Sequence, residues 1–158
     1  MANTQSMCTS FMGELMTATH NFGTAPIRAA TTADTFKAAL YLTSATVNAS
    51  TTAYSSTNEV TGTGYTAGGV TVTNATAPIA TNSSATAGVA YWTPSASITY
   101  TTVTLTTAFD CVLIYNSSQS NKAVSVHTFG SQTITAGTFT LTMPSNTTST
   151  ALLRLSTT

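Results

Sequence analysis

The residues that could carry out chemistry in this chain are few and widely separated. Of 158 residues, four are basic, four are acidic and two are histidine. Charged side chains make up about 25% of an ordinary soluble domain, whereas here they make up 5%. Because most catalysis needs clustered carboxylates, imidazoles or ammonium groups, this composition favours a structural or binding protein over an enzyme. The charged residues are Glu14, Arg28, Asp34, Lys37, Glu59, Asp110, Lys122 and Arg154.

The arrangements that these residues could form lack their usual sequence signatures. Zinc needs three or four ligands at characteristic spacing, and the two histidines and two cysteines do not show it. A serine–histidine–acid triad would need Asp34 or Asp110 to orient His127, but no serine lies in a nucleophile-elbow motif. Two carboxylates could hydrolyse a glycoside only if folding brought them about 5–10 Å apart. We therefore expect no catalytic residue, no cofactor and no metal site.

The charge balance also limits the partners that this chain can bind. Its net charge is +0 and its isoelectric point is about 6.7. Nucleic acids and anionic membranes both require clustered lysine or arginine, so four scattered basic residues predict neither partner. A net charge near zero removes self-repulsion and therefore favours assembly. With no signal peptide apparent at the N-terminus, we expect Cys8 and Cys111 to stay reduced, as in a cytoplasmic product.

Apolar residues near the N-terminus recur at three- and four-residue spacing, which predicts a helix from about Thr9 to Thr19. This helix could cover the core of a sheet, or it could be an arm that docks on a neighbouring subunit. We assign residues 1–30 to an N-terminal helix or arm and residues 31–158 to a β domain. The apolar positions are Met7, Cys8, Phe11, Met12, Leu15 and Met16.

Alternating apolar residues predict β-strands throughout the rest of the chain. The nearly continuous apolar run Asp110–Tyr115 predicts a central strand, and Asn116–Asn121 has the composition of a turn before a return strand. The alternation changes phase at Thr101–Thr102, which indicates a bulge or a change of partner sheet. Ala136–Gly137 is expected to separate two further strands, and Leu152–Leu155 to form the last one.

Seven to nine short strands with regular turns are typical of an all-β, jelly-roll-like β-sandwich. Threonine is β-branched and favours strands. Its Thr-x-Thr repeats are irregular, so they indicate the solvent faces of sandwich strands rather than an ice-binding solenoid. Four glycines between Gly62 and Gly69 indicate tight turns, since no P-loop lysine follows them.

Six segments together form a distinctive pattern: Asp34–Tyr41, Thr52–Tyr54, Asn58–Gly69, Leu113–Asn116, Ser120–Val124 and Ala136–Thr140. In these segments the chain resembles a widespread group of small tailed-phage virion proteins. Some members of that group are similar to capsid cement, or decoration, proteins, which are commonly β-sandwiches or jelly rolls on the head shell. The resemblance implies no catalytic residue.

This resemblance leads us to expect a decoration protein that is made in the bacterial cytoplasm and binds the virion head surface. The expected partners are the major capsid protein and further copies of itself. The alternatives are a tail or fibre protein that binds a host surface glycan, and a threonine-rich ice-binding or adhesive protein. The candidate assembly contacts are Met7, Phe11, Met12, Leu15, Met16, Gly64, Tyr65, Leu153 and Leu155.

Overall fold

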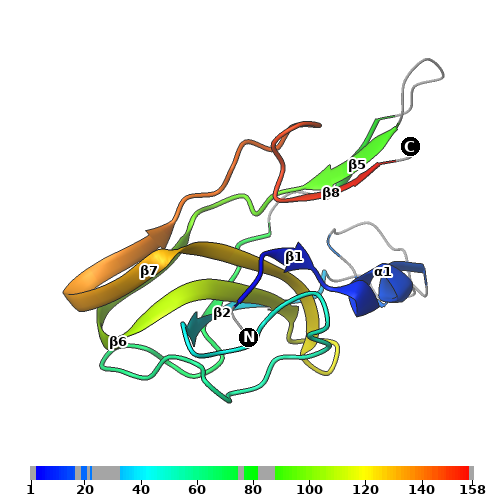
Figure 1. The fold of residues 1–158 in the computed structure, drawn as a ribbon. Coiled ribbons are helices and arrows are strands. Elements are labelled where there is room, and N and C mark those ends of the chain that lie inside the picture. Colours follow the sequence, from blue (N-terminus) through cyan, green and yellow to red (C-terminus); the bar gives the residue numbers. More distant parts are fainter. Residues whose placement is uncertain are drawn as a thin grey trace.

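The computed structural model describes residues 3–16, 19–20, 22, 33–74, 77–81 and 88–156, and it is an all-β structure of two antiparallel sheets (Figure 1). The first sheet has the strand order β1-β7-β6-β2-β3, and the second has the order β4-β5-β8. The strands are β1 (Ser6–Met7), β2 (Phe36–Leu42), β3 (Val70–Thr71), β4 (Ile79–Ala80), β5 (Val89–Trp92), β6 (Ile98–Asn116), β7 (Lys122–Leu141) and β8 (Leu153–Ser156).

The all-β class expected from the sequence is confirmed. The N-terminal apolar stripe forms one helix, α1 (Thr9–Met16), which ends earlier than the expected Thr19. The residues that directly follow it lie outside the described residues. Phe11 on this helix is only 2% exposed and belongs to the hydrophobic core, so the helix covers part of the sheet.

The centre of the fold is one long hairpin, β6–β7, that bends over on itself (Figure 1). Its two strands pair from Ile98↔Leu141 at the open end to Asn116↔Lys122 at the turn. Phe139, near the open end, lies 5.1 Å from Phe109, measured between ring centroids. The two halves of the same hairpin therefore face each other and form both layers of the core.

Local backbone irregularities produce this bend. The β6–β7 register shifts repeatedly between Tyr100 and Cys111, and Thr102 has a φ of 54°. The bulge predicted at Thr101–Thr102 is thus confirmed. The prediction that Ala136–Gly137 separates two strands is wrong: Ala136, with a φ of 46°, forms a bulge inside the continuous strand β7. Its amide donates a hydrogen bond of 3.0 Å to Oγ1 of Thr104, so contact with β6 is kept.

The prediction of a central strand is also confirmed. The second half of β6 lies between β7 and β2, and every residue from Cys111 to Asn116 is buried. In a strand that is buried on both faces, apolar residues need not alternate with polar ones, which explains the continuous apolar run. The expected turn, Asn116–Asn121, joins β6 to β7.

The chain passes between the two sheets three times, after β3, after β5 and after β7. Strand β8 confirms the predicted C-terminal strand and pairs with β5 in the register Trp92↔Leu153 and Ala90↔Leu155. In Figure 1 the strands β5 and β8 lie above β1 and α1. The space between the small sheet and α1 holds the site described next.

Candidate functional site

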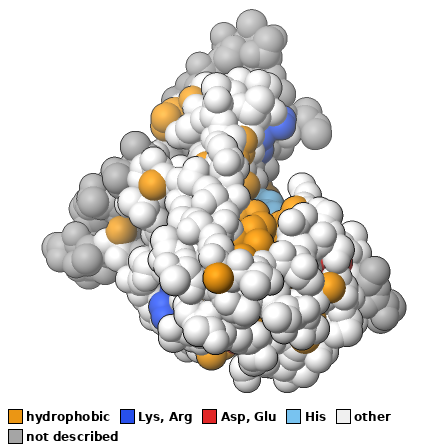
Figure 2. Space-filling model, turned by 90° about the vertical axis from the view of Figure 1, so that its left-hand side faces the viewer, with side chains coloured by type: hydrophobic (Ala, Val, Ile, Leu, Met, Phe, Trp, Pro, Cys, Tyr) orange, Lys and Arg blue, Asp and Glu red, His pale blue; other side chains and the backbone are white. Residues whose placement is uncertain are grey.

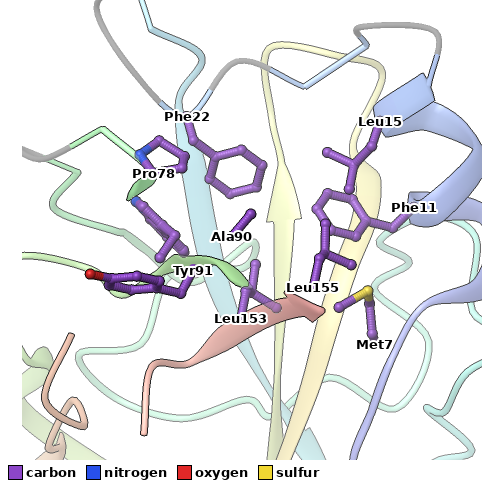
Figure 3. Close-up of a pocket in the computed structure, with 10 residues that line it drawn as sticks. Met7, Phe11, Leu15, Phe22, Pro78, Ala90, Tyr91, Leu153 and Leu155 are labelled. Carbon is purple, nitrogen blue, oxygen red and sulfur yellow. The ribbon is translucent and has the colours of Figure 1, made fainter. Parts of the chain in front are cut away.

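An apolar cavity of about 80 Å³ lies between the N-terminal segment and the small sheet (Figure 3). We call it the apolar slot. It opens to the surface beside Leu155, one of the two large hydrophobic side chains that are most exposed among the described residues. The slot is lined by Met7, Phe11, Leu15, Phe22, Pro78, Ala90, Tyr91, Trp92, Leu153 and Leu155.

One wall of the slot is held by β1 and α1. Pairing of Met7 with Ser125 fixes β1 on β7, and the amide of Cys8 continues this pairing by donating to the carbonyl of Val124 at 3.1 Å. The helix begins directly afterwards, which turns Phe11 and Leu15 toward the cavity. The pairing of β1 with β7 and the short amphipathic helix that follows β1 thus bring Met7, Phe11 and Leu15 together in this wall.

Stacked aromatic rings form the floor of the slot. The ring of Phe22 stacks on Phe36 at a centroid distance of 4.4 Å and meets Trp92 edge-on at 4.8 Å. The indole Nε1 of Trp92 donates to Oδ1 of Asn74 at 2.8 Å. Such pairs add stabilisation beyond the area they bury, so the floor is a fixed part of the fold.

Five of the nine predicted assembly contacts meet at this slot, from segments far apart in the sequence. They are Met7, Phe11, Leu15, Leu153 and Leu155. Met12 and Met16 belong to α1, but their side chains lie outside the described residues. Sequence reasoning did not assign Phe22 or Ala90 to the site. The register Ala90↔Leu155, which the sequence does not reveal, is what places Ala90 there.

The other two predicted contacts, Gly64 and Tyr65, lie in a separate and more polar pocket. Their loop packs closely on the protein's own strands: the Tyr65 hydroxyl accepts a hydrogen bond from the amide of Leu40 at 3.0 Å. A Cβ on Gly62 would lie 2.1 Å from the carbonyl oxygen of Thr104. Gly64, Gly68 and Gly69 have positive φ values of 78°, 89° and 70°, so the interpretation of these glycines as turn residues is confirmed.

A polar cluster ties α1 to the β6–β7 turn. His20 is 4% exposed; its Nε2 lies 2.7 Å from Oε2 of Glu14, and its Nδ1 lies 3.0 Å from Nδ2 of Asn116. Since the Asn116 amide group donates, the neutral ring with its proton on Nε2 satisfies both contacts. Lys122 donates to the other Glu14 oxygen at 2.6 Å, and Asn116 also donates to Asp34 at 2.8 Å.

This cluster sets the protonation states of its members. Burial lowers the pKa of His20, although contact with Glu14 opposes the shift. Burial alone would raise the pKa of Glu14, but the hydrogen bonds from Lys122 and His20 outweigh it and lower that pKa. Both ring nitrogens of His20 are engaged, so the imidazole acts here as a structural link between helix and turn.

The triad considered for His127 is not assembled. His127 Nε2 lies 2.9 Å from Oγ of Ser125, which is 1% exposed and so shielded from a substrate. Asp34 binds Asn116 and Gln119, and Asp110 accepts from Asn3 at 2.6 Å. Among the described residues, no group of three histidine, cysteine or acidic side chains could hold a metal ion.

The histidines should make the protein less stable in acid. Burial lowers the pKa of His127 from 6.5 to about 4, so between these values the unfolded chain binds more protons than the folded one. The free energy of unfolding therefore keeps its full value above pH 6.5 and falls as the pH drops toward 4. The total loss is about 3 kcal/mol, because each pH unit costs about 1.4 kcal/mol. His20 acts in the same direction. Urea unfolding from pH 7.5 to 4 measures this loss.

The matched variant for this prediction is His127→Gln, which keeps a hydrogen-bonding side chain but does not titrate. Its free energy of unfolding should vary less with pH than that of the parent protein across the same range. Equal pH profiles for the two proteins would contradict the assignment of a neutral, partly buried His127.

The two cysteines are free and buried. Burial, assisted by Glu14, raises the pKa of Cys8 to about 11. Burial, assisted by Asp110, raises the pKa of Cys111 to about 12. Both side chains are therefore neutral thiols near pH 7 and poor nucleophiles.

In the part of the chain that the structure describes, no helix is long and apolar enough to span a membrane. Comparison with protein families, with curated proteins and with solved structures found no match to this chain. Any assignment of function must therefore rest on the sequence and on the geometry given above.

Proposed function

We propose that this protein is a non-catalytic structural component of a bacteriophage particle, a decoration protein that binds the outer surface of the head. The observation that carries the proposal is the apolar slot, where α1, β1 and the small sheet present apolar side chains at the surface. An exposed apolar recess in a chain with 5% charged residues suits binding by shape and apolar contact.

The internal use of the acidic groups supports this proposal. Glu14, Asp34, Glu59 and Asp110 all accept hydrogen bonds from other side chains of the same chain. Carboxylates that are bonded in this way are poorly placed to form ion pairs with a partner. Recognition by apolar and backbone contacts is what remains, and such contacts are weakly sensitive to salt.

The jelly-roll subtype is part of the same proposal. It is supported by two antiparallel sheets between which the chain passes three times. Connections of this kind are common in sandwiches that coat viral shells. The mechanism would be thermodynamic: a protein that binds only the assembled shell stabilises it by mass action, in proportion to its affinity and concentration.

Two exposed side chains of the small sheet allow a matched test of the slot. Leu155 lines the slot and is 41% exposed, whereas Ile79 is 44% exposed. The registers Ile79↔Tyr91↔Arg154 and Ala80↔Ala90↔Leu155 place the two side chains on opposite faces of that sheet. Leu155→Asp should weaken binding to purified heads at least about tenfold, because binding would bury the new carboxylate. Ile79→Asp should leave it nearly unchanged.

Binding is measured by co-sedimentation with heads that lack the protein, and thermal unfolding confirms that both variants remain folded. Decorated heads should keep the wild-type protein at 1 M salt, a high-salt condition, and should resist heat better than undecorated heads. Loss of the protein in moderate salt, or equal heat resistance without it, would contradict the proposal. A glycan array would then test the tail or fibre alternative.

A further inference from the structure

Strand β7 has one edge that is largely unpaired. Its inner edge pairs with β6 along the whole strand, but its outer edge pairs with β1 only at Ser125 and Val126. No strand of the described chain pairs with that outer edge from Thr128 to Leu141. We call this segment the free edge. An unpaired edge presents backbone donors and acceptors in the arrangement that another strand would complete.

The pairing with β1 shows which backbone groups the free edge presents where it begins. The amide of Cys8 donates to the carbonyl of Val124, so the backbone groups of Val124 and, two residues on, of Val126 point toward β1. By the same alternation those of Thr128 point outward, just where β1 no longer covers the strand. The free edge therefore begins directly where the backbone pairing between β1 and β7 ends.

The free edge lacks the charges that usually prevent strand pairing. Natural edges are commonly protected by lysine, by proline or by bulges. From Ala123 to Leu153 there is no formally charged residue, and the free edge itself contains no proline. It does contain the bulge at Ala136, which curves the edge without adding charge.

An apolar groove lies beside the free edge, at the opening between the two layers. It has a volume of about 120 Å³, and Phe129, Leu141 and Met143 are among the residues that line it. His127 also lines this groove. Figure 2 looks at the molecule from the side of the β7 bend and shows hydrophobic atoms gathered in a hollow on that side. A strand added at the edge would cover this groove.

We propose that two copies of this chain associate through their free edges, as antiparallel strands related by a two-fold axis. Such an axis places the same strand opposite itself, so donors of one copy meet acceptors of the other. The edge carries no charge to repel its own copy, and the net charge is +0. A charged partner strand would find no opposite charge here, whereas the free edge of a second copy is an uncharged segment of the same length.

The contact has a definite centre, which makes a sharp test available. A two-fold axis normal to the two strands sets a residue opposite its own copy, so pairing along Phe129–Leu141 places Thr135 at the axis, facing Thr135 of the second copy. The variant Thr135→Lys therefore brings two like charges together at the axis. The matched control is Thr106→Lys, because Thr106 is likewise an exposed threonine but lies on β6, away from the free edge. Both variants change the net charge equally.

The purified chain is studied alone by sedimentation equilibrium over a range of concentrations, at 0.15 M salt, near physiological ionic strength. We expect a reversible dimer whose dissociation constant rises at least about tenfold with Thr135→Lys and stays within about twofold with Thr106→Lys. Hydrogen exchange should slow in the 128–141 segment as the dimer forms. A chain that stays monomeric at all concentrations, or equal weakening by the two variants, would overturn the inference. Because no phage particle is present, this outcome is independent of the proposed function.

Discussion

Gly69→Ala should abolish stable folding. Gly69 has a φ of +70°, and a Cβ there would lie 1.7 Å from the carbonyl oxygen of Ala38 on β2. That oxygen cannot move freely, since it accepts a hydrogen bond of 2.8 Å from the hydroxyl of Tyr100. Strain at a positive φ and a clash with backbone add together, so we expect a loss of more than about 4 kcal/mol in the free energy of unfolding.

The control for this substitution is Gly130→Ala. Gly130 has no positive φ, and a Cβ added there meets nothing within 4 Å. The free energy of unfolding of the Gly130→Ala variant should stay within about 0.5 kcal/mol of that of the parent protein. Thermal and urea unfolding compare the two variants, and the soluble yield serves as a further measure if Gly69→Ala does not fold. Similar stability of both would show that β2 and the glycine loop are not in close contact.

Glu59→Ala should be the second most damaging single change. Glu59 is 5% exposed, and its carboxylate accepts hydrogen bonds from the hydroxyls of Tyr54 and Tyr65, both at 2.6 Å, and from the amide of Gly68 at 2.8 Å. Removing the carboxylate leaves three donors without an acceptor in a largely buried site. We expect a loss of about 3–5 kcal/mol.

Glu59→Gln separates the loss of hydrogen bonds from the loss of volume. The glutamine carbonyl can still accept from Gly68 and Tyr65, and the Tyr54 hydroxyl can rotate to accept from the new amide group. We therefore expect a loss of only about 1–2 kcal/mol. Urea unfolding measures both values, and hydrogen exchange in the 59–69 segment should accelerate much more in the alanine variant. Equal stability of the two variants would contradict the role given to the carboxylate.

Local sequence patterns predicted the elements of this fold better than their connections. The run Cys111–Tyr115 indicated a buried central strand because continuous burial requires continuous apolarity, and the structure agrees. Small residues such as Ala136 and Gly137 suit turns and bulges alike, so the sequence predicts a break between two strands there. Only pairing with a distant strand distinguishes the two, and that pairing is not a local property.

The candidate site shows the same limit. The stripe of Met7, Phe11 and Leu15 follows from helical periodicity, and the C-terminal leucines follow from strand alternation. Their meeting at one slot depends on the β5–β8 register and on β1 pairing with β7. Gly64 and Tyr65 are predicted contacts because a glycine-rich backbone can approach a partner closely, yet they lie in another pocket. The sequence thus indicated which residues are apolar, but not which of them are neighbours.

The bent hairpin also has a consequence for how the chain folds. Both layers come from one hairpin, so its pairs lie progressively farther apart in sequence, from Asn116↔Lys122 at the turn to Ile98↔Leu141 at the open end. Each pair shortens the loop that the next must close, and pairing can therefore spread outward from the turn at modest entropic cost. The layers can meet only after this spreading is nearly complete. The turn should accordingly be structured in the transition state and β8 should join late, a sequence of events that refolding kinetics of turn and β8 variants would resolve.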